Sequence, residues 1–203
     1  MDKIDLKKTL KLFYKAPKDP VIVEVPKFQF LMIDGQGDPG TAQSYQDAIQ
    51  TLYPLSYGLK FLLKKSGVVD YGVMPLEGLW WAEDMAAFTV AGKRDEWLRT
   101  AMIMQPDFVT KEQVQQTIET VGEKKNPPAL EKVRFESYHE GVSVQILHLG
   151  PFAEEGPTIE RMHQYAFDQG YKRRGKHHEI YLSDFRRTAP EKLRTILRQP
   201  LSK

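Results

Sequence analysis

The stretch His177–Asp184, with the sequence HHEIYLSD, alternates polar and apolar side chains in a way that is typical of a β-strand. Because successive side chains of a strand point to opposite faces, Glu179 and Tyr181 share one face with His177, and the even-numbered residues take the other. A carboxylate is thereby placed where a core residue could lie. If that face lines a cavity, Glu179 is a chemical centre, whereas a solvent-facing strand would make it an ordinary surface residue.

The composition of the 203-residue chain is that of an ordinary globular domain, with 41% hydrophobic and 28% charged residues. The 29 Lys and Arg against 27 Asp and Glu give a net charge of +2, too small to indicate nucleic acid or an anionic membrane as a partner. The absence of cysteine excludes disulfides and thiolate nucleophiles. With no apolar leader and no apolar run long enough to span a membrane, we expect a soluble cytoplasmic protein.

The first half of the chain predicts a short helix at 2–14, an extended segment at 21–33 interrupted at Pro26, and a long helix at 41–65. Pro54 should kink or split that long helix. The glycine-rich turn that precedes it matches neither phosphate-binding fingerprint. Three further strands are expected at 76–81, 85–91 and 97–104.

The second half predicts a helix that begins with a capping box formed by Thr110 and Gln113. A proline-containing linker at 124–128 follows this helix. Beyond the linker we expect, in order, a hairpin with strands at 133–138 and 142–149 around Glu140-Gly141, a helix at 154–169, the strand that begins at His177, and a last helix that begins at Thr188.

The order of elements repeats along the chain. A strand, a turn, a helix and a strand at 28–81 recur at 142–182, although the two sequences are only faintly similar. The repeat predicts an α+β fold of duplicated β-α-β-β units, with an antiparallel sheet, helices on one face and a central cleft for a small ligand. We expect an N-terminal helical extension at 1–20 and a single domain at 21–203, whose halves are about 21–125 and 129–203.

The motifs HEIYLSD at 178–184 and RRTAPEKL at 186–193, with the tandem Trp80-Trp81, resemble those of GyrI-like small-molecule-binding proteins. The resemblance covers most of residues 20–200. It implies a doubled sheet whose central cleft binds aromatic or cationic compounds through stacked aromatic rings and a buried glutamate. Some stand-alone members, which this chain resembles in carrying tandem tryptophans, hydrolyse reactive cyclopropane-containing electrophiles. Other members are ligand sensors fused to DNA-binding helices, and we expect no such helices in this chain.

Glu179 and Tyr181 are the candidate catalytic residues. A carboxylate in an aromatic, water-poor cleft holds its proton more tightly, so that it becomes a usable general base near neutral pH or a counter-charge for a bound cation. The base could activate water against a strained electrophilic carbon, and the Tyr181 hydroxyl could donate to the developing oxyanion. His177 and Glu179 could instead begin a metal site with His139, His148 or His163, but without a recognised ligand motif we expect no metal and no cofactor.

The candidate ligand-binding residues are mostly aromatic. Trp80 and Trp81 are adjacent in a strand, so they point to opposite faces and at least one of them requires a surface other than the sheet core. Plain core packing is the alternative for every aromatic residue of this set. The full set, which includes one acid at a position similar to that of Glu179, is Trp80, Trp81, Tyr71, Trp97, Tyr45 and Glu77.

Three functional hypotheses follow from these observations. The first is a protein that binds a hydrophobic, aromatic or cationic small molecule. The second is a hydrolase that uses Glu179 as general base against reactive cyclopropane-type electrophiles. The third is a protein-interaction module. We expect a small-molecule ligand as partner, neither nucleic acid nor membrane, and a monomer or weak homodimer.

Overall fold

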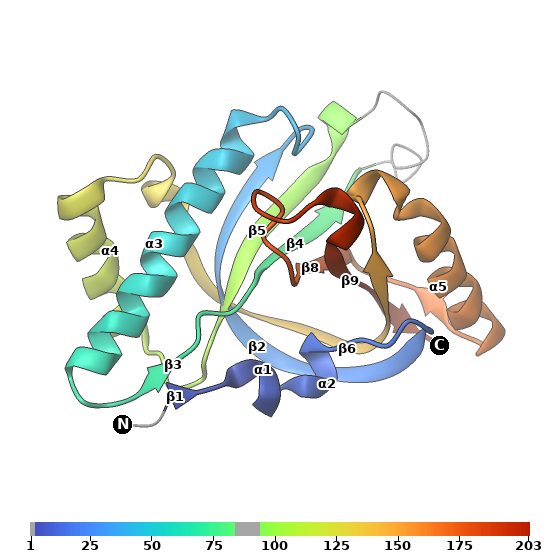
Figure 1. The fold of residues 1–203 in the computed structure, drawn as a ribbon, viewed down its shortest axis with the longest axis horizontal. Helices are drawn as coiled ribbons and strands as arrows, with labels where there is room; N and C mark the ends of the chain where they lie inside the picture. The colour runs from blue at the N-terminus through green and yellow to red at the C-terminus, as the bar shows by residue number, and fades with distance from the viewer. Residues whose placement is uncertain (1–2, 84–93) are drawn as a thin grey trace. The chain divides into compact units, whose positions relative to one another are not determined.

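The computed structural model describes residues 3–83 and 94–203 (Figure 1). It divides into two compact units. Unit 1 comprises Met1–Thr9 and Phe28–Tyr138, and unit 2 comprises Leu10–Lys27 and His139–Lys203. The strand that the sequence predicts at 85–91 lies outside the described residues.

The sheet of unit 1 is antiparallel and centres on β5 (Leu98–Gln105). β5 pairs on one side with β2 (Val21–Gln36) and on the other with β4 (Leu76–Trp81). Its middle residues Met102 and Ile103 are 0% exposed, as expected for a strand covered on both faces. The strands expected at 76–81 and 97–104 are confirmed to within one residue.

β2 is one continuous strand, so the predicted interruption at Pro26 is wrong. The pairing of β2 with β5 begins at Gln29, which leaves Pro26 outside the ladder between these two strands. A proline interrupts a strand only where its missing N–H would have been needed for pairing. Pro26 is also exposed to solvent, and the strand continues through it.

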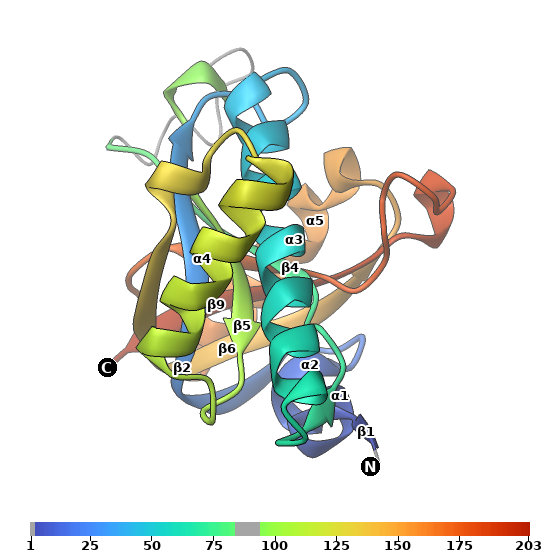
Figure 2. The same cartoon turned by 90° about the vertical axis from the view of Figure 1, so that its left-hand side faces the viewer.

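Two long helices of unit 1 lie side by side (Figure 2). α3 (Gln43–Lys65) packs on β5, and α4 (Lys111–Lys125) packs on α3. α3 is not split at Pro54, because its buried face continues past the proline through Leu55 and Leu59. Gly58 permits the close approach of α4, since a Cβ at this position would lie 2.7 Å from Thr117 Cγ2.

The capping box predicted at the start of α4 is confirmed. The Thr110 hydroxyl accepts from the Gln113 N–H at 3.3 Å, and the Gln113 side chain accepts from the Thr110 N–H at 3.0 Å. These two bonds satisfy backbone donors that have no partner within the helix.

The N-terminal segment differs from the single helix expected at 2–14. It forms β1 (Lys3–Ile4), α1 (Leu6–Thr9) and α2 (Lys11–Tyr14). Leu10 separates the two helical turns because its backbone leaves the helical region, with φ −99° and ψ 31°. In unit 1, β1 pairs in parallel with β3 (Asp70–Tyr71), and Asp70 accepts hydrogen bonds from Lys60 at 2.5 Å and Lys64 at 2.7 Å.

Unit 2 centres on β9 (Arg194–Ser202), which the sequence analysis wrongly assigned to a last helix. β9 pairs antiparallel with β6 (Arg134–Leu149), β8 (His177–Tyr181) and β7 (Lys172–Arg173). Its residues Thr195, Ile196 and Leu197 are all 0% exposed. A run that is buried on both faces carries no alternation, so its spacing did not distinguish a central strand from a helix.

β6 is also continuous, which overturns the hairpin predicted around Glu140-Gly141. Glu140 is 2% exposed and is ion-paired inside unit 2, so it does not lie at a solvent-facing turn. Gly141 accommodates the strand at this point with a φ of +67°, which other residues rarely adopt.

The helix α5 (Gly156–Asp168) covers the face of the unit 2 sheet where Met162 and Ala166 pack against Val144, Ile146 and Leu197. Apart from the two-residue strand β7, unit 2 has the order β6, α5, β8, β9, which matches β2, α3, β4, β5 in unit 1 when the two-residue strand β3 is left out. The duplicated β-α-β-β plan is confirmed, with β9 in the place of the expected last helix. Single 3₁₀ turns lie at Arg94–Glu96, Leu130–Lys132, Phe152–Glu154 and Pro190–Lys192.

None of the helices in the described ranges combines the length and the apolar character that crossing a membrane requires.

Candidate functional site

The strand predicted at His177 is β8, and it places Glu179 in a mostly buried environment. The Glu179 side chain is 16% exposed. The Tyr181 hydroxyl donates a 2.7 Å hydrogen bond to Glu179 Oε2, and His177 Nε2 lies 3.7 Å from Glu179 Oε1. The three side chains on this face therefore form one polar group. The alternative of a solvent-facing glutamate does not apply.

A second carboxyl group, Glu155, belongs to this site and was missed by the sequence analysis. Glu155 precedes α5 and is 5% exposed. Burial, followed by the charge of Glu179, raises the pKa of Glu155 far above its ordinary value of 4.5, and the Thr195 hydroxyl opposes this shift. Glu155 is thus held protonated beside Glu179. An acid just before a helix usually faces solvent, so the sequence carried no signal that this one is buried.

The two carboxyl groups have different surroundings. Tyr181 donates to Glu179, and a donated hydrogen bond favours the ionised form of a carboxyl group. Glu155 Oε1 is buried and has no hydrogen-bond partner in residues 3–83 and 94–203. Where the surroundings of two neighbouring carboxyl groups make their pKa values differ, the group with the lower pKa can act as base and the other as acid. Here Glu179 is the candidate base and Glu155 the candidate acid.

Phe152 packs against the tyrosine of this site, and Phe185 packs against Phe152. The Phe152 ring meets the Tyr181 ring edge to face at a centroid distance of 5.6 Å, and it meets the Phe185 ring at 6.1 Å. Phe152 is 39% exposed, so it links the buried tyrosine to the surface of unit 2. Neither phenylalanine is among the candidate residues indicated by the sequence pattern.

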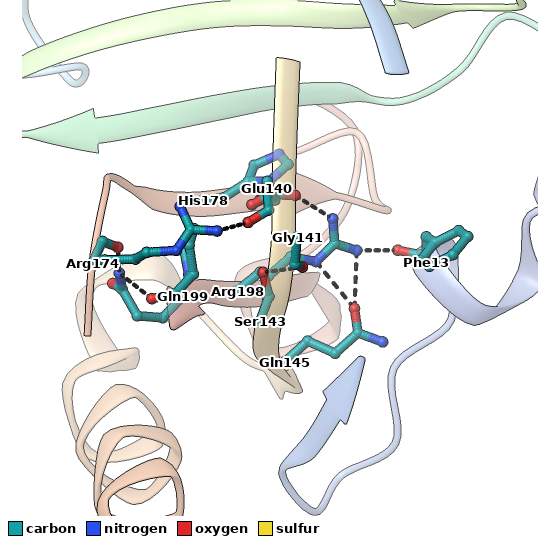
Figure 3. Close-up of polar contacts among 10 residues, drawn as sticks. Phe13, Glu140, Gly141, Ser143, Gln145, Arg174, His178, Arg198 and Gln199 are labelled. Carbon is teal, nitrogen blue, oxygen red and sulfur yellow. Dashed lines mark hydrogen bonds and ion pairs between the residues drawn. The ribbon is translucent and has the colours of Figure 1, made fainter. Parts of the chain in front are cut away.

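The opposite face of β8 carries a buried ionic network (Figure 3). His178 Nδ1 lies 3.0 Å from Glu140 Oε1, and Arg198 Nη1 donates to Glu140 Oε2 at 2.8 Å. Burial alone would raise the pKa of Glu140, but the charges of His178 and Arg198 outweigh it and lower the pKa to about 2. Arg198 also donates to Gln145 and to the Phe13 carbonyl. β8 is thus held to β6, β9 and the N-terminal segment of unit 2.

Two histidines of unit 2, the buried His177 and the partly exposed His163, have lowered pKa values. Burial and the neighbouring His163 and His178 lower the pKa of His177 to about 3, although Glu140 opposes the shift. Burial and Arg173 lower the pKa of His163 to about 4. Both imidazoles are therefore neutral at physiological pH.

The part of the chain that the structure describes contains no cluster of ligands that would support the metal-site hypothesis. Within the described ranges, no three His, Cys, Asp or Glu side chains are grouped as metal ligands. His148 lies with its Nδ1 3.0 Å from Thr158 Oγ1, and His139 is exposed. We assign no metal-ligand role to these residues.

In unit 1, three of the predicted aromatic residues form one cluster. The Trp80 ring lies 6.0 Å from the Tyr45 ring and 6.2 Å from the Trp97 ring. Trp80 is 4% exposed, while Trp81 is partly exposed, which agrees with the expected opposite faces of these two residues.

The other two predicted residues of unit 1 are deeply buried. Glu77 is 1% exposed on β4. Tyr71, also 1% exposed, packs edge to face on Phe108 at 5.5 Å, and burial raises its pKa. Tyr71 therefore belongs to a second aromatic contact and is not joined to the Trp80 ring by any ring contact in the described residues.

A buried arginine supports the Trp80 cluster and was not anticipated. Arg99 is 1% exposed and lies over the Tyr45 ring at 5.2 Å. It donates to the Gly37 carbonyl at 2.9 Å and to Ser44 Oγ at 2.6 Å. A Cβ at Gly35 would lie only 2.9 Å from the guanidinium, so the glycine makes room for it. Burial lowers the pKa of Arg99.

The duplicated β-α-β-β fold places the protein in a class of α+β domains built from two matching halves. Residues 99–201 match the GyrI-like small molecule binding domain family. The chain belongs to the GyrI-like small-molecule-binding family, as the C-terminal motifs indicated.

Solved structures extend this similarity over the whole chain. A conserved protein from Listeria innocua is 42% identical, with a TM-score of 0.90 over 98% of this chain and 100% of its own. A hydrolase from Listeria innocua is 41% identical, with a TM-score of 0.89 over 99% of this chain and 100% of its own. The C-terminal domain of EcmrR is 14% identical, with a TM-score of 0.56 over 91% of this chain and 98% of its own, and shares the fold alone. No curated protein sequence matches the chain.

Proposed function

We propose that this protein binds a hydrophobic, aromatic or cationic small molecule and hydrolyses an electrophilic member of that class. The observation that carries the proposal is the asymmetric carboxyl pair, in which Glu155 is held protonated beside a Glu179 that accepts from Tyr181. Support also comes from the hydrolase of Listeria innocua that is 41% identical over 99% of this chain.

The proposed reaction adds water across a strained, electrophilic ring. Glu179 takes a proton from water as the oxygen bonds to a cyclopropane carbon. The ring C–C bond breaks, and its electron pair moves to a conjugated carbonyl oxygen. Glu155 gives its proton to that oxygen, and Tyr181 stabilises the charge that develops there. One water is consumed, and the proton taken up by Glu179 then restores the acid.

The aromatic residues of unit 1 remain proposed ligand-binding residues. Aromatic faces hold flat apolar or cationic molecules by stacking and by cation–π attraction. Trp81 is the more exposed of the two tandem tryptophans, so its contribution to ligand binding is tested first. Trp97, Trp80 and Tyr45 are tested next. Leucine variants of each residue, titrated with an aromatic cation, show which of these side chains contribute to affinity. Tyr71 and Glu77 are tested in the same series.

The test of hydrolysis is incubation with an electrophilic cyclopropane compound, whose loss and hydrated product are followed by chromatography. We expect Glu179→Gln and Glu155→Gln to lower the rate by at least about a hundredfold, the usual contribution of a general acid or base. The matched control is Glu154→Gln, which changes an exposed neighbour of Glu155.

Absence of turnover by the wild-type protein, with binding of aromatic cations retained, would leave a binding protein without hydrolase activity. Stoichiometric co-purification of another protein with loss of both properties would favour an interaction module instead.

A further inference from the structure

His177 is a buried titratable group beside the candidate base, and the proposed reaction does not use it. It is 9% exposed, and its Nε2 lies 3.7 Å from Glu179 Oε1. This nitrogen has no hydrogen-bond partner within residues 3–83 and 94–203. A buried polar atom without a partner in a folded protein requires an explanation, and a functional role is one of the common ones.

The geometry makes Glu179 the natural partner of this nitrogen. A carboxylate only accepts hydrogen bonds, so an imidazole facing it carries its proton on the near nitrogen. A separation of 3.7 Å is longer than a hydrogen bond, but catalytic contacts are often long without substrate and tighten in the complex. Tyr181 already donates to the other oxygen of Glu179 at 2.7 Å.

The charged and titratable groups around these two side chains come from several elements of unit 2. α5 and the residue before it supply His163 and Glu155, β6 supplies Glu140, and β8 supplies His178 and Tyr181. Burial and its neighbours lower the pKa of His177 to about 3, so the imidazole acts as a neutral donor and not as a cation. A neutral N–H in the same place should therefore be able to replace it.

We propose that His177 is a positioning residue that donates from Nε2 to Glu179 Oε1 and thereby fixes Glu179 as the ionised member of the carboxyl pair. The inference rests on the proposed function of Glu179 as general base. In this role His177 favours the state in which the proton is on Glu155 and Glu179 is ionised. Without this donor the pKa values of Glu155 and Glu179 become more alike, so that one group no longer acts as base while the other acts as acid.

The test compares His177→Gln, whose amide N–H reaches the position of Nε2, with His177→Leu, which fills a similar space without a donor. We expect the leucine variant to lose about tenfold in kcat/KM on the acidic side of the pH profile and its acidic limb to move to higher pH. The glutamine variant should stay within about threefold of the wild type. His139→Leu, at an exposed histidine, is the matched control.

A second measurement does not depend on turnover. Carbon-13 NMR of carboxyl-labelled glutamate, assigned with Glu179→Gln and Glu155→Gln, follows the titration of both acids directly. We expect the Glu179 midpoint to move to higher pH in His177→Leu and to return in His177→Gln. If circular dichroism shows the leucine variant unfolded, His177→Asn takes its place, because its amide reaches only as far as Nδ1.

An unchanged pH profile and an unchanged Glu179 titration in His177→Leu would overturn the inference. Equal losses in the leucine and glutamine variants would also overturn it, because they would indicate packing alone. Failure of the wild type to turn over any electrophile would overturn the proposed hydrolysis, whereas the NMR titration would still decide the role of His177.

Discussion

Arg198 Nη1 donates a 2.8 Å hydrogen bond to Glu140 Oε2, and both residues are 2% exposed. Removing one member of a buried ion pair leaves the other charged and unsolvated, which costs about 3–5 kcal/mol. We expect Arg198→Met to lower the free energy of unfolding by that amount in urea denaturation. Arg186→Met, which removes the exposed pair with Asp184, should change it by less than about 1 kcal/mol. Similar small effects in both variants would contradict the assigned role of Glu140.

Stability should fall steeply in acid. The pKa of Glu140 is lowered from 4.5 to about 2, and that of His177 from 6.5 to about 3. A group with a lowered folded-state pKa contributes stability above its unfolded value, and this contribution is lost as the pH falls through the folded value. Thermal unfolding should therefore show a falling melting temperature from about pH 4.5 down to pH 3, a range in which Glu155 is protonated in both the folded and the unfolded chain. A flat profile over this range would show that these groups are not buried as described.

Glu155 has the opposite effect on the pH dependence of stability. Its pKa is raised above 4.5, so the unfolded chain releases the proton at a pH where the folded chain retains it. The stability associated with this group is present below about pH 4.5 and is lost as the pH rises. We expect Glu155→Gln to raise the melting temperature at pH 8 while it lowers activity, a trade-off common at functional sites. A gain of the same size at pH 4 would argue against this origin.

The contact between α3 and α4 can be tested at Gly58. A Cβ there would lie 2.7 Å from Thr117 Cγ2 and 3.3 Å from Val121 Cγ2. Overpacking of this kind costs about 1–3 kcal/mol, from which the better helix propensity of alanine recovers up to about 1 kcal/mol. Gly58→Ala should thus be destabilised in urea. Thr117→Ser removes the clashing methyl group but keeps the hydroxyl bonded to the Gln113 carbonyl, so the double variant should recover part of the loss. If the losses of stability in the two single variants simply add in the double variant, Gly58 and Thr117 are not in close contact, which would contradict the close approach of α3 and α4.

Much of the fold could be predicted from local patterns. The capping box at Thr110, the long amphipathic helix α3 and the alternation of His177–Tyr181 are local signals, and all three are present in the structure. The repeated order of elements was also visible, because it requires only that each element be recognised. The buried strand β9 and the continuous strand β6 were misassigned, because complete burial removes alternation and an inward glutamate looks like a turn residue.

The sequence by itself determined the strand that carries Glu179 and Tyr181, and the family motifs indicated a small-molecule-binding domain. Only the tertiary structure decided what surrounds that strand. It brought Glu155 from the start of α5 to Glu179, and it placed His178, Glu140 and Arg198 together on the opposite face. The physical reason is that protonation depends on burial and on charges that come from distant parts of the chain, and neither quantity is encoded in the spacing of neighbouring residues.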